Sequence, residues 1–195
     1  MAIDRRADYV YKDILFYDDL NRWSINGSPQ YLTQTVMSGA TVQPFQGVFN
    51  LFPATGYSHF KIIVSKLTTS VGGLQLNMKL MDGASLSGST YDQAYQQVTY
   101  AGALTYAGGT GLTAWSIVRN TDTTNASSAV IDVFNPFVAL TVTGMSKISN
   151  DGTGYSTSSG RIGNSNAFDG FQLSLSAAGT MTGTVTVYAL RNGSA

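Results

Sequence analysis

The sequence predicts an all-β protein, an antiparallel β-sandwich or barrel with an extended N-terminal arm. Three observations carry this prediction. Charged residues make up 11% of the chain and every acidic residue is aspartate, whereas exposed helix faces favour Glu, Lys and Arg. Short segments alternate apolar and polar residues with the period of a β-strand. Gly, Asn and Ser stand between these segments, at positions typical of turns.

Composition limits the kinds of partner to expect. A chain of 195 residues with 43% hydrophobic residues can form one globular domain with a buried core. The formal net charge is zero and the pI is about 6.5, so we expect no nucleic acid partner. No apolar run reaches the ~20 residues of a membrane span, and the charged start lacks the apolar core of a secretory signal. Cysteine is absent, which excludes disulfides and thiolate metal sites; we expect no membrane partner and no cofactor.

The charge is concentrated at the N-terminus. Residues 1–22 hold nine charged side chains, and the remaining 173 positions hold thirteen. We therefore divide the chain into an N-terminal arm, residues 1–45, and a sandwich domain, residues 46–195. Within the arm, residues 12–22 fit a short helix and residues 14–17 equally fit a short strand, before an Asn-Gly and Pro turn at 24–29. Residues 30–44 are polar and rich in Thr, so we expect them to be extended.

The sandwich domain is expected to consist of short strands. The first five are predicted at 47–52, 59–66, 74–81, 95–102 and 112–119. In the segment 74–81, period-two alternation places one set inward and the other outward, namely Leu74, Leu76, Met78 and Leu80 against Gln75, Asn77, Lys79 and Met81. Residues 129–144 predict two strands separated at Pro136, because proline cannot donate to a ladder. Residues 148–170 are rich in Gly, Ser and Asn and predict a long loop.

The segment 168–195 has the most regular pattern in the chain. Phe171, Leu173 and Leu175 alternate with polar residues, and after a Gly-containing turn Val185 and Val187 alternate with Thr and Tyr. Period two on both sides of a turn predicts a β-hairpin. We expect its last strand to be paired within a sheet.

Four segments in this order carry a family resemblance: "FPATGYSHFKIIVSK", "LNMKLMDGASLSGSTY", "IDVFNPFVALTVTG" and "FDGFQLSLSAAGTMTGTVTVYALRNG". Together they resemble jelly-roll β-sandwich structural proteins of tailed bacteriophage virions, of the capsid decoration or cement type, over about Val48–Asn192. The resemblance implies a non-enzymatic homotrimer on the capsid surface of the virion, made in the bacterial host cytoplasm and bound to the major capsid protein. The alternative is a tail or head fibre component, or a receptor-binding module that recognises carbohydrate.

Most chemically active side chains have a structural interpretation. His59 is the only histidine, so by itself it cannot build a metal site or a catalytic triad. Asp82, Asp151 and Asp169 each precede Gly and suit turns. Gly-rich residues 108–112 and 152–160 lack the Lys-Ser/Thr of a phosphate-binding loop. A glycoside hydrolase would need two facing carboxylates, and the candidates to examine are Asp92, Asp122, Asp132 and Asp169.

Aromatic side chains indicate two possible binding surfaces. Tyr, Trp, Phe and Arg are enriched at protein interfaces, and the arm supplies the predicted capsid-binding residues Arg5, Arg6, Tyr9, Tyr11, Phe16, Tyr17, Arg22 and Trp23. The other interpretation is that the arm packs on the flank of its own sandwich. In the domain, an exposed cluster of aromatics could stack on sugars, although each alone suits a core or a loop; these are Tyr100, Tyr106, Trp115 and Tyr155.

Overall fold

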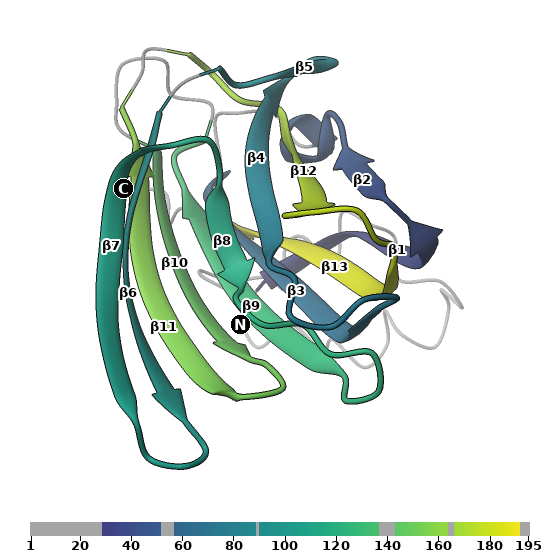
Figure 1. Cartoon of the computed structure of the whole chain (residues 1–195). Helices are drawn as coiled ribbons and strands as arrows, with labels where there is room; N and C mark the ends of the chain where they lie inside the picture. Colours follow the sequence, from purple (N-terminus) through teal and green to yellow (C-terminus); the bar gives the residue numbers. More distant parts are fainter. Residues whose placement is uncertain (1–28, 52–56, 89, 137–142, 164–165, 192–195) are drawn as a thin grey trace, which may run out of the picture.

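The computed structural model describes residues 29–51, 57–88, 90–136, 143–163 and 166–191. In this part of the chain, thirteen strands and one 3-10 helix form an antiparallel, jelly-roll-like β-sandwich, which confirms the predicted fold class (Figure 1). The larger sheet has eight strands in the order β1-β13-β3-β9-β10-β11-β6-β7. The second sheet has the order β2-β12-β4-β5, and β8 also pairs with β4.

The strands of both sheets are short to medium in length. The eight-stranded sheet contains β1 (Pro29–Ala40), β3 (Tyr57–Thr69), β6 (Tyr91–Thr99), β7 (Leu104–Leu112), β9 (Ser127–Phe134), β10 (Thr143–Asn150), β11 (Gly154–Ile162) and β13 (Met181–Arg191). The second sheet contains β2 (Val42–Phe45), β4 (Leu76–Asp82), β5 (Ser85–Leu86), β8 (Trp115–Val118) and β12 (Gly170–Leu175). The 3-10 helix η1 (Val48–Leu51) lies between β2 and β3 in the sequence.

The core lies between the two sheets, where the inward residues of each strand meet. The alternation predicted for β4 is confirmed for its central residues, since Leu76, Met78 and Leu80 are fully buried. Each such side chain stabilises the fold by about 1.5–3 kcal/mol relative to an exposed one. Met81, predicted to face outward, is buried as well, at the end of β4 where β5 and Gly170 flank it.

The segment 47–52 was predicted as a strand, and this prediction is wrong. Gly47 has a φ of 67°, a left-handed conformation that turns the chain out of the β2 direction. The following residues form η1, which directs Phe49 into the core. The Phe49 ring lies 4.6 Å from that of Phe60 and 5.7 Å from that of Phe171, so η1 closes one end of the sandwich with aromatic side chains.

The last two strands do not form the predicted hairpin. β12 pairs with β2 and β4 in the second sheet, whereas β13 pairs with β1 and β3 in the eight-stranded sheet. The connection between them therefore crosses from one sheet to the other (Figure 1). The prediction that the last strand is paired within a sheet is confirmed, because β13 has neighbours on both sides.

Two Gly-rich segments, one of them predicted as a loop, are strands. β11 occupies much of the predicted loop 148–170, and β7 includes the Gly-rich residues 108–112. Glycine in β11 meets a packing requirement: a Cβ atom on Gly154 would lie 2.1 Å from the carbonyl oxygen of Val98, and one on Gly160 2.7 Å from Nε1 of Trp115. These glycines permit close approach of neighbouring groups, which composition alone does not distinguish from loop flexibility.

The described part of the predicted arm belongs to the sheets. Residues 30–44 are extended as expected, in β1 at the edge of the eight-stranded sheet and in β2 of the second sheet. β1 pairs with β13 from Pro29–Leu190 to Ala40–Met181. Residues 1–28 lie outside the described residues.

Candidate functional site: the outer face of the eight-stranded sheet

The side chains of the eight-stranded sheet point alternately into the core and away from it. On β3, Phe60, Ile62 and Val64 are buried, so Lys61 and Ile63 point outward. The strand register aligns the outward residues of all eight strands in rows. One row runs from β7 to β1 through Tyr106, Gln96, Thr157, Ile148, Val130, Ile63, Thr186 and Gln34. We call this surface the outer face.

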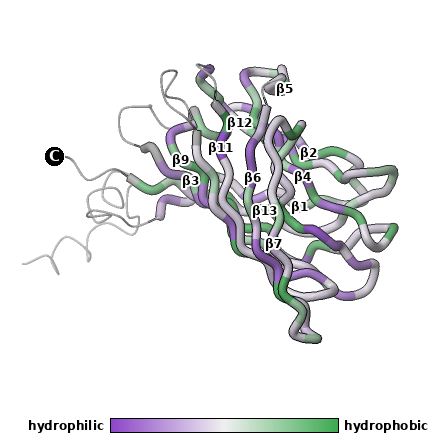
Figure 2. The backbone as a smooth tube through the Cα atoms, turned by 60° about the vertical axis from the view of Figure 1, so that its left-hand side comes forward, coloured by the Kyte–Doolittle hydropathy of each residue, from purple (hydrophilic) through white to green (hydrophobic). Residues whose placement is uncertain are grey.

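The outer face carries most of the large apolar side chains that the described residues expose. Tyr106 is 69% exposed and Ile148 is 63% exposed. We define the outer-face patch as these two residues together with Tyr31, Val36, Leu104, Val130, Phe134 and Tyr155. Figure 2 shows β6, β7 and β11 as neighbouring strands coloured by hydropathy. A concentration of exposed apolar residues on one face indicates an interaction surface.

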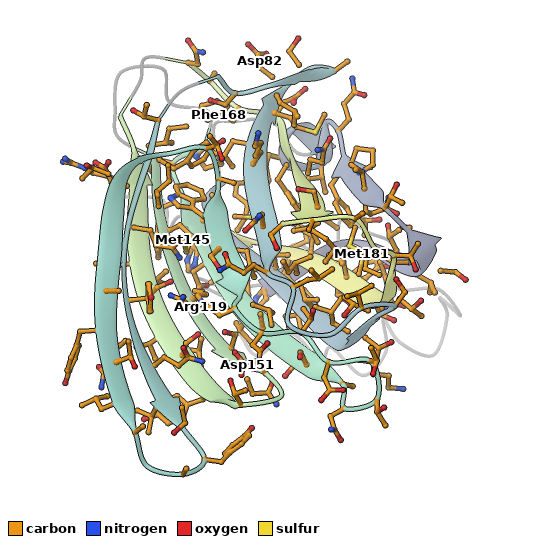
Figure 3. All side chains as sticks on the ribbon, in the orientation of Figure 1. Asp82, Arg119, Met145, Asp151, Phe168 and Met181 are labelled. Carbon is orange, nitrogen blue, oxygen red and sulfur yellow. The ribbon has the colours of Figure 1, made fainter. Side chains whose placement is uncertain are left out.

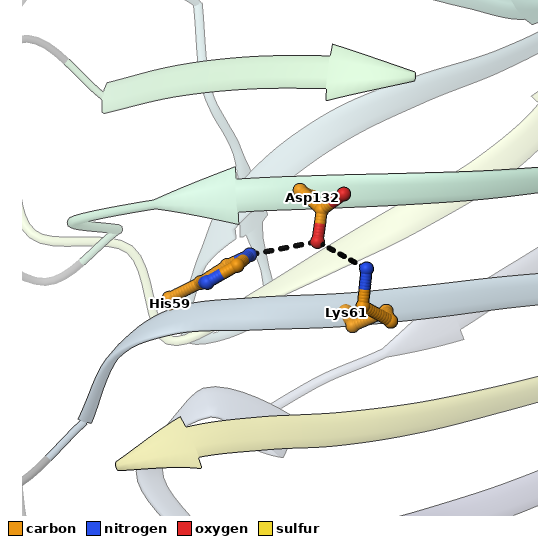
Figure 4. Close-up of polar contacts among 3 residues, drawn as sticks. All are labelled: His59, Lys61 and Asp132. Atoms are coloured by element: carbon orange, nitrogen blue, oxygen red, sulfur yellow. Dashed lines mark hydrogen bonds and ion pairs between the residues drawn. The ribbon is translucent and has the colours of Figure 1, made fainter. Parts of the chain in front are cut away.

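Two groups of charged side chains on the outer face are paired. Nε2 of His59 and Nζ of Lys61 each lie 2.7 Å from Oδ1 of Asp132 (Figure 4). The His59 ring also stacks on Phe134 at a centroid distance of 4.5 Å. On neighbouring strands, Nε of Arg161 donates to Oδ2 of Asp92 at 3.0 Å. The outer face is therefore polar in places, and the positive and negative groups of these two contacts match each other, whereas the exposed Lys66 of β3 belongs to neither contact.

A shallow groove of about 670 Å³ crosses the outer face. Lys61 and Asp132 contribute to its lining from β3 and β9, Ile148 from β10, and Gln96 and Tyr106 from β6 and β7. Apolar, amide, hydroxyl and charged groups therefore lie together in an open depression. Such a surface can bind a protein or an extended polar ligand.

Beneath the outer face, Lys147 of β10 points into the sandwich and is almost completely buried. Its Nζ donates to the carbonyl oxygen of Ile117 at 2.8 Å, to Oγ of Ser149 at 3.1 Å and to Oγ of Ser156 at 2.8 Å. Burial, together with the nearby positive charge of Arg119, lowers the pKa of Lys147 to about 8.

Two more charged groups belong to this interior cluster (Figure 3). The guanidinium carbon of Arg119 lies 3.7 Å from the centroid of the Tyr95 ring, a cation–π contact. The carboxylate of Asp151 opposes the lowering of the Lys147 pKa. Oδ1 of Asp151 accepts hydrogen bonds from the backbone of Thr153 and Gly154, as a turn residue does. Sequence reasoning did not identify Lys147, although its spacing from Met145 places both residues on the inward side of one strand.

The predicted chemical candidates occupy structural positions. His59 pairs with Asp132 as described, which agrees with the expected structural or surface role. Asp169, expected to bond the amides of its own turn, instead accepts a hydrogen bond from the backbone N–H of Gly83, which is 86 positions away in the sequence. Asp122 accepts bonds from the backbone N–H groups of Thr124 and Asn125, which hold the pKa of this carboxyl below its usual value.

The aromatic candidates differ from one another in exposure. Trp115, which we considered for a sugar-binding cluster, is fully buried, and its ring packs edge-on against Tyr91. Tyr100, Tyr106 and Tyr155 are exposed. The predicted capsid-binding residues lie outside the described residues; they are Arg5, Arg6, Tyr9, Tyr11, Phe16, Tyr17, Arg22 and Trp23.

Comparison with known proteins gives no relative: no family model, no curated protein and no solved structure matches this chain. Within the described ranges, no three His, Cys, Asp or Glu side chains are grouped so that they could hold a metal ion. The same ranges contain no helix with the length and apolar character needed to cross a membrane.

Proposed function

We propose that this chain is a non-enzymatic structural protein of a virion, a decoration protein that binds the outside of a bacteriophage capsid and stabilises it. The jelly-roll-like sandwich agrees with the resemblance on which this proposal is based. The partner would be the major capsid protein, and the contacts would come from the aromatic and arginine side chains of the arm. Burial of such side chains commonly dominates the affinity of a protein interface.

The observation that carries this proposal is the attachment of the arm to the sandwich. The predicted capsid-binding residues end six positions before β1, which starts at Pro29. β1 pairs with β13 along its length, and β13 in turn pairs with β3. A pull on the arm along β1 is resisted by many backbone hydrogen bonds together, so the sheet would hold the arm firmly while it is bound to a capsid.

A homotrimer would strengthen this binding through several simultaneous contacts. Linked sites raise the overall affinity by about 10²–10⁴ when the geometry allows all of them to bind at once. Because the protein would bind the assembled shell and not its separated subunits, mass action would stabilise the shell.

Deletion of residues 1–25 tests the proposal. We expect the truncated protein to keep the melting temperature of the full chain and to lose co-sedimentation with DNA-free heads of the virus that encodes it. A matched control replaces residues 1–25 with a Gly/Ser linker of equal length, which should also fail to bind. Decoration of the heads at full occupancy by either variant would contradict the proposal.

Exposed tyrosines favour a second candidate, a fibre component that recognises carbohydrate. Tyr106 and Tyr155 belong to the outer-face patch, and Tyr100 lies exposed in the β6–β7 turn. Aromatic faces stack on sugar rings, and the amide of Gln96 in the groove could bond to sugar hydroxyls. A glycan array supports this candidate if binding is lost in Tyr106→Ser, and an array without signals beside clear capsid binding dismisses it.

A further inference from the structure

We propose that the outer face of the eight-stranded sheet is the surface through which copies of this chain associate. The expectation that copies associate rests on the proposed function. The new element is the assignment of the contact to one face and to named residues.

The first argument is the difference between the outward faces of the two sheets. The outer face exposes the eight large apolar side chains of the outer-face patch. The outward positions of β4 and β12 in the second sheet are instead polar, namely Asn77, Lys79, Gln172 and Ser174. Exposed apolar residues concentrated on one face of the sandwich indicate a contact that excludes water from that side.

The second argument is charge. Lys61 and Asp132 form one pair on the outer face and Arg161 and Asp92 form another. A strongly charged partner would find no excess of opposite charge on this face. A second copy would bring the same matched pairs, so these groups would stay paired on association, which is the condition under which ionic groups are tolerated at an interface.

The third argument is area. Eight strands about 4.8 Å apart and about eight residues long, at about 3.4 Å per residue, span a face on the order of 1,000 Å². A stable interface needs about 800 Å² from each partner. The face is therefore large enough for a standard interface with another copy, and the groove gives it relief into which a projecting part of that copy could fit.

The experiment is sedimentation equilibrium of the purified full chain and of variants in the patch. We expect the wild type to be a dimer or a trimer. Ile148→Lys and Tyr106→Lys should each raise the dissociation constant at least ~100-fold, because a lysine would be buried at the interface without a partner. Both side chains are well exposed in the single chain, so we expect both variants to fold, with unchanged circular dichroism and melting of the monomer.

The matched control is Val42→Lys. Val42 is an aliphatic strand residue that is 45% exposed, and it lies in the second sheet. This control should keep the oligomer of the wild type. A dimer would mean that the two faces meet each other, and a trimer would mean that each face meets a different surface of its neighbour; both support the proposal.

Three results would overturn the inference: a wild type that stays monomeric at high micromolar concentration, patch variants that associate as the wild type does, or a control that dissociates as they do. A monomer whose patch variants lose capsid or glycan binding would assign the face to that ligand. The chain lacking residues 1–25 should remain an oligomer. A full-length chain that forms the oligomer but fails to bind capsids would refute the proposed function and leave this inference intact.

Discussion

The buried amine of Lys147 leads to a prediction about stability and pH. In the folded chain its pKa is about 8, against 10.5 for an ordinary lysine. At a pH between these two pKa values, the lysine is still protonated in the unfolded chain and has lost its proton in the folded chain. Stability therefore rises with pH across this window, because the unfolded state binds more protons. Below pH 8 the charged amine is buried in the folded state and its destabilising effect is fully present.

The size of this effect follows from the difference between the two pKa values. One pKa unit corresponds to about 1.4 kcal/mol between the two protonation states. The free energy of unfolding should therefore gain about 3 kcal/mol from Lys147 between pH 8 and pH 10.5. This is a large part of the total stability of an ordinary domain, which is about 5–15 kcal/mol.

The assay is urea unfolding of the wild type and of Lys147→Met at several pH values from 7 to 10.5, followed by tryptophan fluorescence. Other groups also contribute to the pH dependence of stability in this range; burial raises the pKa of Tyr91, for example. Such effects are shared by both proteins and cancel in the difference between them. We expect the wild type to gain about 3 kcal/mol relative to the variant as the pH rises. Parallel profiles for the two proteins would refute the reasoning.

Two further variants test the packing of the sheet and the pairs on its outer face. Gly160→Ala should lower the free energy of unfolding by about 1–3 kcal/mol, since the added Cβ would collide with Trp115. The control Gly163→Ala has open space around the added Cβ and should leave the stability measured by urea unfolding unchanged. Equal effects of the two variants would contradict this account. Asp132→Asn should lower the free energy of unfolding by about 1 kcal/mol at low salt and by less at high salt, because it weakens a partly exposed contact with His59 and Lys61. A loss of stability that does not depend on salt would argue against an ionic contribution.

Local alternation predicted which residues of a strand face the core, and it did so best where both neighbouring strands are regular. The inward set Leu76, Met78 and Leu80 of β4 is an example. Alternation does not say which strand lies alongside. β12 and β13 have hairpin-like patterns, yet they bury their apolar residues from opposite sides of one core. The partner of a strand is set by long-range packing, which a single sequence does not reveal.

The sequence-based interpretation of the glycines in β11 and of the charged residue in β10 was incomplete for a related reason. Glycine-rich composition predicts a loop. Gly160 instead lies in a strand, where a larger residue would collide with Trp115. In β10 the apolar Ile148 is exposed and the charged Lys147 is buried, which reverses the usual preference. This reversal is possible because Nζ of Lys147 donates hydrogen bonds to the carbonyl oxygen of Ile117, to the hydroxyl of Ser149 on its own strand and to the hydroxyl of Ser156 on β11. The outer-face patch could not be predicted for the same reason, since it depends on the register of eight strands.

The position of β13 between β1 and β3 has a consequence for how the chain matures. Gln34 and Thr186, which share a hydrogen bond, are 152 positions apart in the sequence. While the ribosome is still making the chain, β1 has no companion strand until residues 181–191 emerge. Contacts of such long separation are slow to form, and an unaccompanied strand is prone to aggregation. The nascent chain is therefore vulnerable to aggregation until β13 has been synthesised, and yields in recombinant expression should improve when chaperones are abundant.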